Sequence, residues 1–282
     1  MKTEEWTWNS TDRLAMHATG WTPDGAPTAL IVFVHGHGDH AGTHGQIAEA
    51  FCKRGYEVQG FDLRGHGRSG GRRGHTASYE ALMDDIESFL SQARKRRPGL
   101  PTFLYGHSMG GNLVLNFALR RKPDLAGVLA TAPWLKLAFQ PPAVKVALAR
   151  VANAVFPAFT QDAGLDLGGL THDPVINKAH VDDPFGHTLI SARLFLTVYE
   201  AGLWALDNAG GFGLPLLLLH GTTDPITSFD ASSEFAARVG SAARFVPCEG
   251  LYHNIHEEPD NAPAMAAIVG WLEERRSATA RR

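Results

Sequence analysis

The sequence predicts an α/β fold in which a mostly parallel sheet is flanked by helices. Short apolar runs alternate with stretches of helical periodicity along most of the chain. These runs are apolar at successive positions, which is typical of strands buried on both faces of a parallel sheet. The 282 residues, 44% of them hydrophobic, suit one core that carries a sizeable insertion. We therefore expect one sheet covered by helices on both faces.

Six apolar runs define the expected strands of this sheet. The first run ends at His35-Gly36, and a long gap separates the fourth run from the fifth. The expected strands span residues 29–34, 56–63, 102–105, 127–130, 216–219 and 244–246.

Four helical stretches are readable between and after these strands. The first opens with Ser78 as an N-cap and places Leu82 and Ile86 on one apolar face. The second stops before Pro123, and the third ends at Gly240, which suits a helix C-terminus. The expected helices span residues 78–96, 112–121, 232–239 and 262–274.

The alternation of strands and helices breaks over residues 135–206. This segment holds an amphipathic stretch at 144–156 and a second helical stretch at 189–199. The sequence therefore predicts a core of residues 1–134 and 207–282, with residues 135–206 inserted between two core strands as a helical cap.

A candidate nucleophile lies in the run Gly106-His107-Ser108-Met109-Gly110. This Gly-x-Ser-x-Gly pattern falls between a predicted strand and a predicted helix, the setting of a nucleophile elbow. The glycines remove side-chain clashes from the tight turn and leave the Ser108 hydroxyl exposed. The following helix directs its first N–H groups toward developing negative charge.

A serine nucleophile needs a base, and the base needs an orienting acid. Asp224 follows the predicted strand at 216–219, and ligand sites collect at the carboxyl ends of such strands. Asp207 and Glu200 are poorer candidates because neither follows a core strand. Asp224 is therefore the expected acid.

Two histidines after the last predicted strand compete for the role of base. His253 comes first and follows a glycine and a tyrosine, as expected of a loop histidine presented to a site. His256 is the alternative. The pair also forms His-x-x-His, but no carboxylate or cysteine with ligand spacing supports a zinc site there. We expect His253 to be the base.

The oxyanion hole is expected to use two backbone N–H groups. One belongs to Met109, directly after the nucleophile, and the other to His37 in the loop after the first strand. The run His35–His40 also resembles the zinc-binding motif of metallo-β-lactamase-fold hydrolases. That alternative requires further metal ligands downstream, which the sequence lacks, and leaves the later serine, aspartate and histidine unexplained. We expect no metal and no organic cofactor.

Composition excludes several other classes of protein. The net charge of −3 gives no basic footprint for nucleic acid. The N-terminus has no apolar leader and no run approaches a membrane span, so a cytoplasmic location is expected. Cys52 and Cys248 are expected to be reduced and buried, with a single disulfide as the alternative.

Five motifs together resemble the monoacylglycerol lipase and lysophospholipase branch of the α/β-hydrolases, in the expected order over nearly the whole chain. The resemblance implies an α/β-hydrolase fold, catalytic roles for Ser108, Asp224 and His253, and oxyanion donors at His37 and Met109. It also implies an apolar cap that accepts one acyl chain and often rests on membranes. The motifs are His35-Gly36-x-Gly38-x-His40, Asp62-x-Arg64-Gly65-His66-Gly67-x-Ser69, Gly106-His107-Ser108-Met109-Gly110-Gly111, His220-Gly221-x-x-Asp224 and His253-x-x-His256-Glu257.

The chain departs from this family pattern after His40. Relatives often have Ser-Gly-Arg-Tyr there, whereas this chain has Ala41-Gly42-Thr43-His44, which leaves the contacts at the glycerol end open. The apolar residues of the insertion either line an acyl pocket or pack the insertion onto the core. The predicted pocket residues are His44, His107, Leu137, Phe139, Phe156 and Phe159.

These features predict a carboxylic ester hydrolase that acts through an acyl-enzyme. A medium- or long-chain monoacylglycerol is the expected substrate, and a lysophospholipid or simple carboxylester is the alternative. A non-hydrolytic receptor on the same fold and a zinc hydrolase are more remote. The expected partners are a small lipid ester and, transiently through the cap, a membrane surface. Nucleic acid is not expected, and no oligomeric state is predicted.

Overall fold

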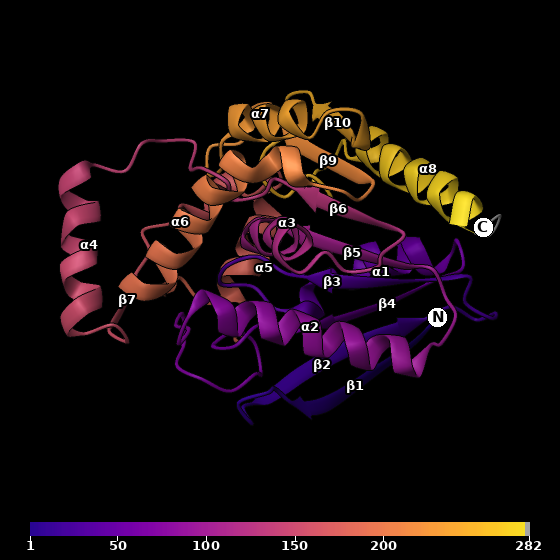
Figure 1. Cartoon of the computed structure of the whole chain (residues 1–282), viewed down its shortest axis with the longest axis horizontal. Helices are drawn as coiled ribbons and strands as arrows, with labels where there is room; N and C mark the ends of the chain where they lie inside the picture. Colours follow the sequence, from indigo (N-terminus) through magenta and orange to yellow (C-terminus); the bar gives the residue numbers. More distant parts are fainter. Residues whose placement is uncertain (280–282) are drawn as a thin grey trace.

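The computed structural model describes residues 1–279, which contain an eight-stranded sheet. The strand order is β1-β2-β4-β3-β5-β6-β9-β10 (Figure 1). All neighbours from β4 to β10 are parallel, and β1 and β2 add an antiparallel edge, which confirms the predicted fold class. The strands are β1 (Lys2–Asn9), β2 (Ala15–Thr22), β3 (Ala29–Val34), β4 (Tyr56–Phe61), β5 (Thr102–His107), β6 (Gly127–Thr131), β9 (Leu216–Gly221) and β10 (Ala243–Cys248).

The antiparallel edge was not predicted from the sequence. β1 is polar at most positions, but Trp6 and Trp8 alternate with threonine and glutamate and face the core. Trp8 packs edge-on to Phe61, and both tryptophans contact Phe89. Period-two alternation is the signature of a strand with one face toward solvent, so the signal was present in these residues.

Helices cover both faces of the sheet and build two hydrophobic cores. Successive residues of a strand point to opposite faces. Leu30 and Val32 of β3 therefore join the core under α2 and α3, whereas Ile31 and Phe33 join the core under α1 and α8. The flanking helices are α1 (Gly45–Cys52), α2 (Tyr79–Arg96), α3 (Met109–Arg121), α7 (Phe229–Val239) and α8 (Ala262–Thr279).

The helix boundaries follow local chemistry. The Ser78 hydroxyl accepts a hydrogen bond from Ala81 N at 3.1 Å, which confirms it as the N-cap of α2. α3 begins at Met109, three residues earlier than predicted, because the chain enters the helix directly from the turn at Ser108. Gly240 follows α7 with φ of 76°, a left-handed value that favours glycine.

The inserted segment is helical, with a small two-stranded sheet of its own. The helix expected over 189–199 instead begins at Ala192, because residues 189–191 pair with residues 160–162. α4 packs on α6 and lies at the left edge of Figure 1, away from the large sheet. The elements are α4 (Ala143–Val155), β7 (Thr160–Asp162), α5 (Pro174–Asp182), β8 (Leu189–Ser191) and α6 (Ala192–Asn208).

Two further observations concern the whole described chain. Among the helices of residues 1–279, none combines the length and apolar character needed to cross a bilayer. Cys52 and Cys248 are both buried and free. Burial raises the pKa of each thiol to about 11, so both are protonated at neutral pH.

Candidate active site

The turn between β5 and α3 holds Ser108 in an unusual backbone conformation. Its φ of 55° and ψ of −118° lie where residues with a side chain are rare. A Cβ on Gly106 would lie 2.2 Å from the Gly110 oxygen, and one on Gly110 would lie 2.0 Å from the Val34 oxygen. The glycines of the motif are therefore required sterically.

Three predicted residues meet at this turn although 116 and 29 residues separate them along the chain. His253 Nε2 lies 2.8 Å from Ser108 Oγ, and His253 Nδ1 lies 2.7 Å from Asp224 Oδ2. A neutral imidazole with its proton on Nδ1 donates to the carboxylate and accepts from the serine hydroxyl. The rival His256 is buried nearby, and among the described residues neither of its ring nitrogens has a hydrogen-bond partner.

The Asp224 carboxylate is held by a dense set of donors. The backbone N–H groups of Ile226 and Thr227 donate to Oδ1 at 2.7 and 3.0 Å, and the Thr227 hydroxyl donates to Oδ2 at 2.8 Å. Burial opposes ionisation of Asp224, but the charge of His253 and hydrogen bonds from His220 and His253 outweigh it and lower its pKa. Asp224 is thus a fixed anion that accepts from the imidazole.

The loop after β3 approaches the nucleophile closely enough to supply an oxyanion donor. A Cβ on Gly36 would lie 3.1 Å from the Cβ of Ser108. The neighbouring His37 places its ring Nδ1 3.4 Å from His66 Nε2, so its side chain is engaged with another histidine. Burial lowers the pKa of His37 to about 3, which keeps the ring uncharged. Met109, the other predicted donor, opens α3 and is fully buried.

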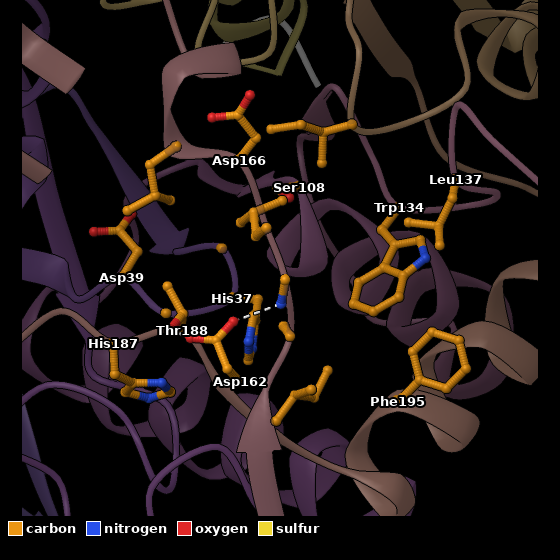
Figure 2. A pocket seen from close by; sticks show the side chains of 18 of the residues that line it. His37, Asp39, Ser108, Trp134, Leu137, Asp162, Asp166, His187, Thr188 and Phe195 are labelled. Atoms are coloured by element: carbon orange, nitrogen blue, oxygen red, sulfur yellow. Dashed lines mark hydrogen bonds between the residues drawn. The ribbon is translucent and has the colours of Figure 1, made fainter. Parts of the chain in front are cut away.

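A cavity of about 1080 Å³ opens onto Ser108 (Figure 2). Its two sides differ in chemistry. Trp134, Leu137 and Phe195 lie together on one side, whereas Asp39 and His187 lie on the other. A cavity with separate apolar and polar sides suits an amphipathic ligand.

Four of the predicted pocket residues line this cavity. His107 precedes the nucleophile, and Leu137 and Phe139 follow the end of β6. Phe159 comes from the segment between α4 and β7, so the inserted segment contributes directly to the wall.

The other two predicted pocket residues, His44 and Phe156, are not among the residues that line this cavity. His44 is buried behind it, donating from Nε2 to Asp39 Oδ2 at 2.7 Å and packing against Phe33. Phe156 ends α4 with 68% of its surface exposed, so its side chain faces solvent.

Sequence reasoning missed Trp134, Phe195 and Asn254 among the lining residues. Trp134 lies just past the carboxyl end of β6, and Asn254 directly follows His253. Their positions after core strands were a usable signal. Phe195 lies inside α6, and only the packing of that helix on α3 brings it to the cavity.

The chain was compared with models of known protein families. A family model for hydrolases described as "Serine aminopeptidase, S33" matches residues 25–260. The chain belongs to this hydrolase family. Within it, the resemblance to the monoacylglycerol lipase branch of the α/β-hydrolases is confirmed by the relatives described next.

Several relatives match nearly the whole chain. The Homo sapiens monoglyceride lipase is 30% identical over 92% of this chain and 87% of its own length. The Mycolicibacterium smegmatis monoacylglycerol lipase is 29% identical over 89% and 90% of the two chains. An abhydrolase domain-containing protein from Dictyostelium discoideum is 32% identical, but this chain spans only 28% of its length.

Solved structures agree with these relatives. The Paleococcus ferrophilus monoacylglycerol lipase is 32% identical and superposes with a TM-score of 0.83 over 98% of this chain and 100% of its own. A soluble variant of the Saccharomyces cerevisiae monoglyceride lipase has a TM-score of 0.88 over 98% and 96% of the two chains. At 23% identity, the second match bears on the fold alone.

Proposed function

We propose that the protein hydrolyses monoacylglycerols to a fatty acid and glycerol through an acyl-enzyme on Ser108. The observation that carries this proposal is the hydrogen-bonded series from Ser108 through His253 to Asp224. It opens into a cavity with one apolar and one polar side. A serine in such a series is activated for acyl transfer.

In the acylation step, His253 Nε2 removes the Ser108 hydroxyl proton as Oγ attacks the ester carbonyl carbon. Asp224 holds the imidazole in the required tautomer and stabilises the imidazolium. The backbone N–H groups of His37 and Met109 bind the oxyanion, each contributing on the order of 3 kcal/mol. His253 then protonates the departing alkoxide, which leaves as glycerol. Water repeats these steps on the acyl-enzyme and releases the fatty acid.

The charges around the cavity support a substrate with an uncharged head group. Four aspartates line the cavity. Among its described lining residues, Lys145 is the only lysine or arginine. Asp39 and Asp183 are paired with histidines, but Asp162 and Asp166 contact only hydroxyl or backbone donors among the described residues. Their negative charge disfavours a phosphate-bearing head group relative to glycerol.

We further propose that residues 135–206 act as the cap of a core formed by residues 1–134 and 207–282. The exposed face of α4 supports a transient contact with a membrane surface, from which the cavity would take up its substrate. Val144, Leu148, Val151 and Val155 follow one another on this face and are each 60% or more exposed. An exposed apolar helix face of this kind is typical of interfacial binding.

A panel of esters with one shared acyl chain tests the substrate proposal. We expect kcat/KM for 1-oleoylglycerol to exceed that for 1-oleoyl-lysophosphatidic acid, whose phosphate has no compensating cation, by at least about ten-fold, since one charged-group contact changes discrimination by roughly this factor. The variant D162N/D166N is expected to bring the two kcat/KM values closer together, because it removes the negative charges that disfavour the phosphate. A preference for the lysophospholipid, or turnover of short p-nitrophenyl esters alone, would contradict the monoacylglycerol assignment.

A further inference from the structure

Two carboxylates, Glu257 and Glu258, tie the loop that carries His253 to the inserted segment, through His180 and His172 respectively. Glu257 Oε2 lies 2.8 Å from Nε2 of His180, a residue of α5. The same oxygen accepts a hydrogen bond from Asn254 Nδ2 at 2.7 Å. His180 and Glu257 are 16% and 13% exposed, so the pair is largely removed from water. Glu257 does not line the cavity, which separates it from direct contact with substrate.

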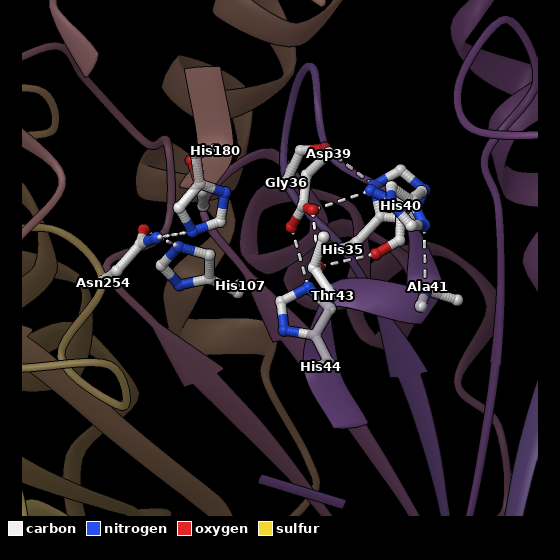
Figure 3. A network of polar contacts seen from close by, with 12 residues as sticks. His35, Gly36, Asp39, His40, Ala41, Thr43, His44, His107, His180 and Asn254 are labelled. Carbon is white, nitrogen blue, oxygen red and sulfur yellow. Dashed lines mark hydrogen bonds and ion pairs between the residues drawn. The ribbon is translucent and has the colours of Figure 1, made fainter. Parts of the chain in front are cut away.

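The connection continues to the residue before the nucleophile. Asn254 Oδ1 lies 3.0 Å from His107 Nε2 (Figure 3). Because an amide oxygen only accepts, His107 carries its proton on Nε2 and its Nδ1 accepts from the Thr131 hydroxyl at 3.0 Å. Burial, followed by the neighbouring charge of His253, holds the pKa of His107 well below its ordinary value. The ring is therefore neutral, as this arrangement requires.

The orientation of the Asn254 amide follows from the same contacts. Its nitrogen faces the Glu257 carboxylate, which can only accept, and its oxygen faces the His107 N–H. The backbone N–H of Asn254 also donates to the Leu170 oxygen of the inserted segment at 2.8 Å. Both the side chain and the backbone next to His253 are thus fixed by partners outside the loop.

We propose that Glu257 is a positioning residue that, held by His180 of the cap, sets the place of His253 relative to Ser108. The inference rests on the serine mechanism proposed above. A general base works only within hydrogen-bond reach of the proton it removes, and displacements of about 1 Å cost as much as 100-fold in rate. The cap therefore acts on the reacting groups as well as on the acyl chain.

The charge state of the pair strengthens this link. Burial opposes ionisation of both partners, but their mutual hydrogen bond and charge lower the pKa of Glu257 to about 2 and raise that of His180. Asp39 and Asp183 add negative charge facing His180, and His256 opposes it. Removing either partner leaves the other largely buried and unpaired, which is costly.

The variants E257Q and H180Q test the proposal, with K178Q as the matched control. Lys178 lies on the same helix, is 73% exposed and pairs with Asp182 within that helix. The substrate is p-nitrophenyl butyrate, whose short acyl chain makes little use of an apolar acyl pocket. Rates are expressed per site titrated with a fluorophosphonate, so that a partly unfolded variant does not distort kcat.

We expect E257Q and H180Q each to lower kcat about ten-fold with KM within about two-fold of the wild-type value. The double variant is expected to be no worse than either single variant, because both break one connection. K178Q should match the wild type. Wild-type kcat on the short ester in E257Q would overturn the inference, as would losses that add in the double variant.

The variant S108A, measured in the same series, separates this inference from the mechanism on which it rests. Loss of turnover in S108A together with wild-type kcat in E257Q and H180Q would contradict the positioning role alone. Retained turnover in S108A would instead contradict the serine mechanism itself.

Discussion

The residues that act with Ser108 are buried, whereas the α4 helix of the inserted segment is exposed. Ser108, Asp224 and His253 are each at most 9% exposed, and partners fix the polar atoms that join them. No residue of α4 is buried, and Val144, Leu148, Val151 and Val155 are each 60% or more exposed, although Leu148 also lines the cavity. The reacting groups thus lie at the buried ends of sheet strands, whereas part of the cavity wall comes from an exposed helix.

The largest effect that would sharpen this comparison is expected at Asp224. The substitution D224N preserves the size of the side chain but removes the charge that fixes the His253 tautomer. We expect kcat to fall by about 10⁴-fold with the fold intact. Steady-state kinetics with a p-nitrophenyl ester measures this loss, and circular dichroism controls for folding. A loss below ten-fold would show that Asp224 does not orient the base.

A smaller effect, on the stability of the fold, is expected at the His180–Glu257 pair, where the inserted segment meets the core. The pKa of Glu257 is lowered to about 2, so its contribution to stability is present above its ordinary value of 4.5 and lost as the pH falls toward 2. The pKa of His180 is raised, so its contribution is present below 6.5 and lost as the pH rises through the raised value. The pair therefore stabilises the protein most between about pH 4.5 and 6.5.

Thermal unfolding measures this contribution. We expect the wild type to exceed E257Q in Tm by about 3 °C near pH 5.5 and by less at pH 9. A Tm difference that stays constant from pH 5.5 to pH 9 would contradict the assigned charge state. The control K178Q should follow the wild type throughout.

The smallest effect on chemistry is expected on α4. The variant V151S/V155S removes two exposed apolar side chains that do not line the cavity. We expect about 30-fold weaker binding to phospholipid vesicles, since each of the two apolar groups contributes about 1 kcal/mol to interfacial binding. Turnover of p-nitrophenyl butyrate should stay within about two-fold. Unchanged sedimentation with vesicles would remove α4 from the proposed membrane contact.

Local sequence predicted the reacting groups better than the walls of the cavity. Ser108 could be read from its neighbours because two glycines must flank a turn in which a Cβ would meet backbone oxygens. Asp224 and His253 could be read from the ends of apolar strands, where parallel sheets collect their functional side chains. These signals lie within a few residues of the group that they identify.

The cavity walls depend instead on how distant segments pack. Phe156 and Phe159 are similar in sequence context, yet only Phe159 lines the cavity. α4 ends at Val155, and a turn closed by the hydrogen bond from Phe159 N to Phe156 O redirects the chain between the two side chains. The His180–Glu257 pair joins positions 77 residues apart. Glu257 stands in the motif His253-x-x-His256-Glu257, but no local pattern links it to His180, and only the tertiary contact brings the two together.

The central claim is that Ser108 forms an acyl-enzyme with His253 as its base. Its most direct test is S108A, assayed for hydrolysis of 1-oleoylglycerol and for labelling by a fluorophosphonate. We expect a fall in turnover of at least about 10⁴-fold and complete loss of labelling, with the wild type labelled at Ser108 alone. More than about a tenth of wild-type turnover in folded S108A, or labelling at another residue, would contradict it.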